Sequence, residues 1–264
     1  MLVSPVTADA SVMAGMVDIY TLGDEDIRMT LDRNQVEWVR TCELLARWLP
    51  PAPGRVIDAG GGPGRQARHL LDLGYEVTLY DIVPKHVDQA RAKGVPAQVG
   101  DARRLPAGDE TADAVLLLGP LYHLPDAADR AQALTEASRV LRPGGVLVAA
   151  ALSRWGRVFV RAAAGELGDP ARHRHTVASM RHGHVEEGDG WDRVAYLHDT
   201  RELETELRTA GLHHVQVVGV EGPTGAWARR DPALNAGALE LARVAETAMA
   251  EASIHLLACG TKPA

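Results

Sequence analysis

VIDAGGGPG, from Val56 to Gly64, is the part of this 264-residue chain that most strongly predicts its fold. It begins with the β-branched residues Val56 and Ile57, which follow a break rich in proline and glycine at residues 50–54. Such a break before a short apolar run predicts a buried strand that emerges from a loop. Asp58 then stands near the carboxyl end of this strand.

Three alternating glycines, Gly60, Gly62 and Gly64, follow the strand and permit a tight turn that a ligand can approach closely. A helix expected from Arg65 to Leu73 would direct its free N–H groups toward that ligand. A dinucleotide site needs the frame G-x-G-x-x-G/A, which can be imposed only through Gly62, Gly64 and Ala67. The frame D-x-G-x-G-x-G is filled by Asp58 and the three glycines without adjustment.

Apolar strands alternate with amphipathic helices along the rest of the chain. Further strands are expected at 75–81, 95–100, 112–118, 145–152, 214–220 and 254–259. Helices are expected at 30–49, 84–93, 126–141, 199–210 and about 232–251. This order predicts an α/β fold with a doubly wound, mostly parallel, seven-stranded sheet, closed by an antiparallel edge. Ligands of such sheets lie outside the carboxyl ends of the strands.

Four segments divide the chain. Residues 1–50 are expected to form an N-terminal helical cap, and residues 51–152 the ligand-binding core. The strand rhythm stops at 153–197, which predicts a helical lid over the substrate, because a structureless loop of that length is unusual. Residues 198–264 are expected to complete the core sheet.

The glycine turn and the acidic strand ends together resemble the class I S-adenosylmethionine (SAM) dependent methyltransferases, and within them the small-molecule enzymes of the type 11/25-like group. The resemblance runs from about Leu31 to the C-terminus and is strongest between Arg55 and Leu152. It implies a Rossmann-like methyltransferase fold, SAM as cofactor and S-adenosylhomocysteine as product. In that family the turn at Asp58, Gly60, Gly62 and Gly64 holds the methionine part of the cofactor.

The resemblance also assigns the later strand ends. Asp81, after the second strand, matches the acid that binds both ribose hydroxyls, since a carboxylate can accept two charge-assisted hydrogen bonds. Asp101 and Ala102 match the position next to adenine. Gly119 matches the glycine after the fourth strand, where the backbone approaches the cofactor.

Candidate catalytic residues follow from their place relative to these motifs. His123 lies just past Gly119, and its imidazole can act as the general base for an acceptor that carries a proton. Tyr20 is expected to close the pocket and to orient the substrate or relay a proton to His123. Tyr122 and His198 are further candidates for substrate contact. Glu25 and Arg28 have the spacing of a local ion pair.

Composition limits the partners. A net charge of −7 and a pI near 5.9 disfavour a nucleic-acid binder and favour a small-molecule substrate.

Cys42 and Cys259 give no disulfide framework, so a cytoplasmic location is expected, with no membrane span. The run from Arg172 to His184 is rich in histidine but has no recognised ligand spacing, so no metal site is expected. Both a monomer and a homodimer stay open.

The sequence therefore predicts methyl transfer from SAM to a small organic molecule, with a specialised metabolite as the expected acceptor. No NPPY-like tetrapeptide follows the fourth strand, which disfavours amino methylation of bases or glutamine. C- or O-methylation is favoured, an aromatic or indole-like acceptor is among the candidates, and N-methylation stays open. The alternatives are an NAD(P)-dependent oxidoreductase, which leaves Asp101 without a role, and a non-catalytic SAM-binding protein.

Overall fold

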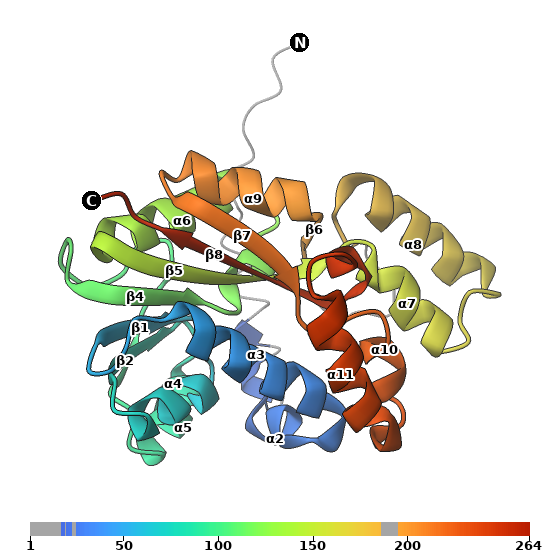
Figure 1. The fold of residues 1–264 in the computed structure, drawn as a ribbon, viewed down its shortest axis with the longest axis horizontal. Helices are drawn as coiled ribbons and strands as arrows, with labels where there is room; N and C mark the ends of the chain where they lie inside the picture. Colours follow the sequence, from blue (N-terminus) through green and yellow to red (C-terminus); the bar gives the residue numbers. More distant parts are fainter. Residues whose placement is uncertain (1–16, 19, 23–24, 186–194) are drawn as a thin grey trace, which may run out of the picture.

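The structure, a computed structural model, is a central twisted sheet with helices on both faces, and it describes residues 17–18, 20–22, 25–185 and 195–264 (Figure 1). The strand order is β3-β2-β1-β4-β5-β8-β7, and β6 pairs with β5 outside this path. The strands are β1 Arg55–Ala59, β2 Glu76–Asp81, β3 Ala97–Val99, β4 Ala112–Leu117, β5 Leu141–Ser153, β6 Leu197–His198, β7 His213–Gly219 and β8 His255–Thr261. The predicted doubly wound fold is confirmed, and the short β6 adds an eighth strand to the seven that were expected.

Strands β1 to β6 pair in parallel, whereas β8 is antiparallel to both β5 and β7. The predicted antiparallel closing edge is therefore present. The order of strands reverses between β1 and β4, because β1 leads outward to β2 and β4 leads to β5 on the other side. This reversal opens a crevice beyond the carboxyl ends of β1 and β4, the position where doubly wound sheets bind ligands.

Helices cover the sheet on both sides. They are α2 Glu25–Thr30, η1 Asp32–Asn34, α3 Gln35–Trp48, α4 Arg65–Asp72, α5 Pro84–Ala92, η2 Pro120–His123, α6 Ala127–Val140, α7 Gly156–Ala163, α8 Pro170–His182, α9 Thr200–Thr209, α10 Gly225–Ala228, η3 Pro232–Leu234, α11 Asn235–Ala245 and η4 Ala250–Ala252. The helix expected at 30–49 begins only at Gln35, after α2 and η1, and the one expected at 232–251 is divided into η3, α11 and η4.

The core consists of two apolar layers, one on each face of the sheet. Helices α3, α4 and α5 pack on one face, with Leu44 and Leu70 fully buried. Helices α6 and α9 pack on the other, with Leu134 and Leu207 fully buried. Because both faces are covered, the central strands are apolar throughout, as the near-continuous run in β4 indicated.

The described residues of the segment 153–197 include helices α7 and α8, which project beyond the end of the sheet beside α10 (Figure 1). Asp169 begins α8, since its side chain accepts hydrogen bonds from the N–H groups of Ala171 (2.9 Å) and Arg172 (3.2 Å). Gly183 ends it in the left-handed conformation, with φ +79°. No helix of the described part is long and apolar enough to cross a membrane.

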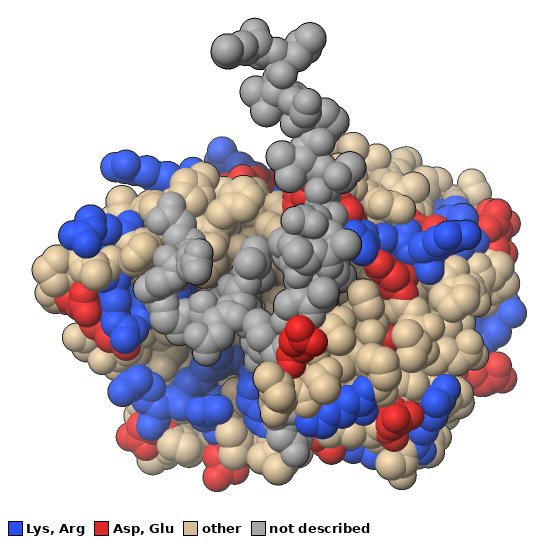
Figure 2. Space-filling view, turned by 180° about the vertical axis from the view of Figure 1, so that it is seen from behind, with Lys and Arg blue, Asp and Glu red and all other residues tan. Residues whose placement is uncertain are grey.

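Charge is mixed over the surface. Figure 2 shows Lys and Arg side chains interspersed with Asp and Glu over the described part of the face opposite to that of Figure 1. The net charge of −7 is therefore not gathered on this face.

Candidate active site

A cavity lies at the carboxyl edge of the sheet, where the strand order reverses. Its floor is formed by the turn after β1 and by the ends of β2, β3 and β4, and its other wall by Tyr20, α2 and the start of α3. Of the twelve candidate site residues from the sequence, Gly64 and His198 do not line the cavity. The other ten do: Asp58, Gly60, Gly62, Asp81, Asp101, Ala102, Gly119, Tyr20, Tyr122 and His123.

The glycine turn after β1 depends on glycine at each of its alternate positions. Gly60 and Gly62 have φ values of +74° and +57°, which side chains rarely tolerate. Space is open beside Gly62, where an added Cβ would meet nothing within 4 Å. Gly64 begins α4 with φ +82°, and its Cβ would come within 2.9 Å of Ala90. Gly64 therefore permits the packing of α4 against α5 and does not face the cavity.

The carboxylate of Asp81 holds the turn in place. Its Oδ2 accepts a hydrogen bond from the N–H of Gly62 (2.8 Å), and its Oδ1 accepts one from the N–H of Val83 (2.8 Å). His86 Nδ1 lies 3.2 Å from the same Oδ1. Oδ2 keeps a further lone pair, which can accept a hydrogen bond from a ribose hydroxyl.

Asp58 is the most unusual group of the cavity, because its carboxylate is 1% exposed and neither oxygen has a hydrogen-bond partner. Burial, with a further contribution from the nearby negative charge of Asp81, raises the pKa of Asp58 from 3.8 to about 7. A buried carboxylate without a partner is expensive unless a cation is supplied. The methionine end of SAM carries an ammonium group, so the chemistry of this position fits the cofactor.

The position next to adenine that the resemblance implies is formed by Asp101 and Ala102, and both line the cavity. Asp101 is held by Arg103, whose Nη2 donates to its Oδ2 (2.7 Å). Asp129 on α6 binds the same guanidinium at 3.0 Å, which fixes the orientation of Asp101. A Cβ added to Gly119 would lie 3.3 Å from the carbonyl oxygen of Gly60, so glycine allows the β4 loop to approach the turn.

Two lining residues of the cavity that are 103 positions apart in the sequence meet. The hydroxyl of Tyr20 lies 2.8 Å from Nε2 of His123. The Tyr20 ring stands edge-on to His123 and to His86, with centroid distances of 5.5 and 5.3 Å. Tyr122 packs against His123 at 4.6 Å, and burial raises the pKa of the Tyr122 phenol. The structure thus brings the side chains of Tyr20 and His123 within hydrogen-bond distance.

Three charged side chains line the wall of the cavity near Tyr20. Glu25 and Arg28 form the expected ion pair, with the two groups 2.5 Å apart, and both also face the cavity. Glu37, from α3, faces it as well and is bound by Arg229 of the α10 region. The sequence pattern suggested only a local role for the Glu25–Arg28 pair.

His86 is a cavity residue that the sequence pattern did not single out. It lines the cavity beside Asp81, and its Nε2 is buried without a hydrogen-bond partner. The available signal was its place five residues after Asp81, in the first turn of α5, where a side chain can fold back toward the strand end.

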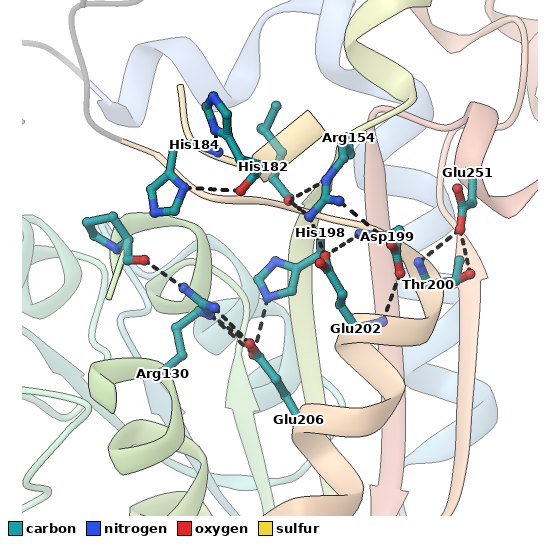
Figure 3. A network of polar contacts seen from close by, with 12 residues as sticks. Arg130, Arg154, His182, His184, His198, Asp199, Thr200, Glu202, Glu206 and Glu251 are labelled. Atoms are coloured by element: carbon teal, nitrogen blue, oxygen red, sulfur yellow. Dashed lines mark hydrogen bonds and ion pairs between the residues drawn. The ribbon is translucent and has the colours of Figure 1, made fainter. Parts of the chain in front are cut away.

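His198 lies elsewhere, in the polar network of Figure 3. It is fully buried, because β6 pairs with β5, and its Nε2 lies 3.2 Å from Glu206 on α9. Glu206 also binds Arg130, at 2.9 Å. The expectation that His198 contacts substrate is therefore not met by the geometry, since strand pairing draws its side chain into the interior.

The same network positions the loop that carries His123. Nη1 of Arg130 donates to the carbonyl oxygens of Leu124 (3.0 Å) and Pro125 (2.9 Å), directly after η2. The guanidinium of Arg130 also lies 3.7 Å above the ring of Tyr196, whose backbone N–H donates to the Tyr122 carbonyl oxygen (2.9 Å).

One group of carboxylates and histidine within the described residues has the spacing of metal ligands: Glu37, Glu221 and His255. Arg229 lies against both carboxylates, at 3.8 Å from Glu221. Burial lowers the pKa of His255, but the negative charges of Glu37 and Glu221 raise it by more, so the pKa of His255 lies above its ordinary value. Arginine and histidine therefore supply the positive charge that these carboxylates need.

The chain is similar to known methyltransferases. Residues 57–149 match the family model described as a methyltransferase domain. An uncharacterised methyltransferase of Mycobacterium tuberculosis is 36% identical over 142 residues, or 51% of this chain and 56% of the relative. A demethylmenaquinone methyltransferase of Deinococcus radiodurans is 34% identical over 143 residues, which again are 51% of this chain and 56% of the relative. The chain thus matches only about half the length of these curated relatives.

Among solved structures, the 1,6-didemethyltoxoflavin-N1-methyltransferase of Burkholderia thailandensis has a TM-score of 0.57 at 17% identity. The match covers 100% of this chain and 94% of that one, which contains bound 1,6-didemethyltoxoflavin and S-adenosylhomocysteine. At this level of identity the likeness establishes the fold.

Proposed function

We propose that this chain, which carries a class I SAM-dependent methyltransferase domain with SAM as its cofactor, transfers a methyl group to a small organic molecule. One observation carries the proposal: a single cavity is lined by the glycine turn, by three strand-end acids and by the Tyr20–His123 pair. Two matched proteins are named for methylation of small molecules, demethylmenaquinone and 1,6-didemethyltoxoflavin, which supports an acceptor of that size class.

The chain's own residues divide the work between binding and proton transfer. Asp58 offers a negative charge to the ammonium of the cofactor, Asp81 offers acceptors to its ribose, and the residues around Asp101 enclose its adenine. SAM supplies an electrophilic methyl group on a sulfonium. Methyl transfer is an in-line displacement, so rate depends on how well the cavity holds the acceptor atom close and aligned.

The Tyr20–His123 pair provides a route for the proton of the acceptor. As the acceptor atom forms its bond to carbon, its proton passes to the Tyr20 oxygen, and the Tyr20 proton passes to Nε2 of His123 across the 2.8 Å hydrogen bond. General-base assistance of this kind contributes roughly 10²- to 10⁴-fold to rate. It serves an acceptor that must lose a proton, which favours C- or O-methylation.

The experiment has two parts. Calorimetric titration with S-adenosylhomocysteine, SAM and NAD tests the cofactor, and binding of NAD without SAM would refute the proposal in favour of an oxidoreductase. A mass-shift screen of small metabolites with SAM then tests catalysis, and the expected product is heavier by one methylene unit. Binding of SAM with no product from any acceptor would favour the non-catalytic alternative. The match to a methyltransferase domain favours SAM binding and formation of a methylated product.

A further inference from the structure

A second hollow lies beside the cavity, between the segment around α2 and η1 and helices α7 and α10. Its polar lining consists of four arginines and one asparagine, and its apolar lining is small: Arg28, Arg33, Arg229, Arg230 and Asn34, with Val160, Ala164 and Ala226. No carboxylate occurs among the described residues that line it. The whole chain has a net charge of −7, so a hollow lined by four guanidinium groups differs in the sign of its charge from the protein as a whole.

Two of these four arginines already have carboxylate partners. Arg28 is paired with Glu25, and Arg229 is paired with Glu37. Arg33 and Arg230 are exposed and have no ion-pair partner within residues 17–18, 20–22, 25–185 and 195–264. The hollow therefore keeps two positive charges that the described side chains do not neutralise.

Shared residues connect this hollow to the cavity. Arg28 lines both spaces. Glu37 faces the cavity, and its partner Arg229 faces the hollow. Two ion pairs thus border both the hollow and the cavity that Tyr20 and His123 line.

We propose that the hollow binds an anionic oxygen group, a carboxylate or a phosphate, carried by the methyl acceptor. The inference rests on the proposed function, since it concerns the acceptor of that reaction. The planar guanidinium of arginine presents parallel N–H donors that match the oxygens of both groups. Arg33 and Arg230 supply the free donors, and Asn34 holds the backbone near them through a hydrogen bond from its Nδ2 to the Arg28 carbonyl oxygen (2.6 Å).

The test uses the full chain and two probes, inorganic phosphate and benzoate, titrated calorimetrically at constant ionic strength. At least one probe is expected to bind, and the double variant Arg33→Gln/Arg230→Gln should lose tenfold or more in affinity. Glutamine keeps a polar side chain and removes the charge at two exposed positions, so folding should be unaffected. Arg201→Gln is the matched control, because Arg201 is exposed on α9, on the far side of the molecule from α2 (Figure 1).

Each outcome decides the question. Binding of phosphate alone points to a phosphorylated acceptor, and binding of benzoate alone to a carboxylic acid. Equal affinity in wild type and double variant, or no binding of either probe, overturns the inference. With an acceptor found by mass shift, KM should rise at least tenfold in the double variant and exceed any change in kcat. An uncharged acceptor with the same KM in both proteins also overturns it.

Titration with S-adenosylhomocysteine separates this inference from the proposed function. The double variant should bind it as tightly as wild type does, because the arginines lie outside the turn and the strand-end acids. If wild type fails to bind it, the proposed function fails while the phosphate and benzoate results still report on the hollow.

Discussion

Replacing Asp58 with Asn should stabilise the protein without cofactor and weaken the binding of S-adenosylhomocysteine. The carboxylate is buried, has no hydrogen-bond partner and lies near the charge of Asp81, so its ionised form is unfavourable in the folded state. The same ionised form is what attracts the ammonium of the ligand. Stability and binding are therefore expected to change in opposite directions.

The magnitude follows from the pKa of Asp58, which rises from 3.8 in the unfolded chain to about 7 in the folded one. Each unit of difference corresponds to about 1.4 kcal/mol, so ionisation of Asp58 costs about 4 kcal/mol of unfolding free energy at pH 8. Because the folded pKa is raised, the folded state binds more protons between pH 4 and 7, and stability is lost as pH rises through that window. At pH 5 the cost is only about 2 kcal/mol.

The assay is urea unfolding of wild type and Asp58→Asn at pH 5 and pH 8. The variant should exceed wild type by up to about 4 kcal/mol at pH 8, and its advantage should shrink by about half at pH 5. Asp88→Asn, at an exposed position on α5, is the control and should show no such change. An identical pH dependence of stability for wild type and Asp58→Asn would show that ionised Asp58 does not destabilise the folded state. Calorimetry should show at least tenfold weaker binding of S-adenosylhomocysteine to the variant at pH 8.

Three further perturbations test other parts of the site. Asp81→Ala should abolish most affinity for S-adenosylhomocysteine in calorimetry, and unchanged affinity would exclude its ribose role. Tyr20→Phe and His123→Ala should each lower kcat by roughly 10²-fold or more once an acceptor is known, with affinity for S-adenosylhomocysteine retained; full turnover at saturating acceptor would exclude the proton route. Because the pKa of His255 is raised beside Glu221, its stabilising charge is present below pH 6.5 and lost as pH rises through the folded value. Thermal unfolding of Glu221→Gln should show this pH dependence reduced, and a curve parallel to wild type would contradict it.

The cofactor half of the site was predictable because its signals are local. A β-branched strand, an acid and alternating glycines occupy consecutive positions, and each later acid ends its own strand. Parallel strands bring their carboxyl ends to one edge, so Asp81 and Asp101 reach the turn once the alternation of strands and helices is recognised. Gly64 shows the limit of this reasoning, because a glycine of the motif supports the packing of α4 on α5 instead of lining the cavity.

The predictions for residues beyond the core strands were weaker. His198 was placed near the substrate from its position before a helix cap, yet the pairing of β6 with β5 buries it. The segment 153–197 has the expected helices, but none of its described residues lines the cavity. Tyr20 and α2 cover the cavity instead. Where a returning segment packs depends on long-range contacts that periodicity does not contain.

Local sequence patterns predict the sheet, the glycine turn and the acids that match a SAM site, because each is a short pattern with a fixed direction in a parallel strand. The residues around the acceptor become known only from the packing of distant segments. Tyr20 meets His123 across 103 residues, and Arg28 and Arg33 share a hollow with Arg229 and Arg230 from the far end of the chain. These groups come together because α2, η2 and α10 pack around one edge of the sheet, and no local pattern specifies that packing.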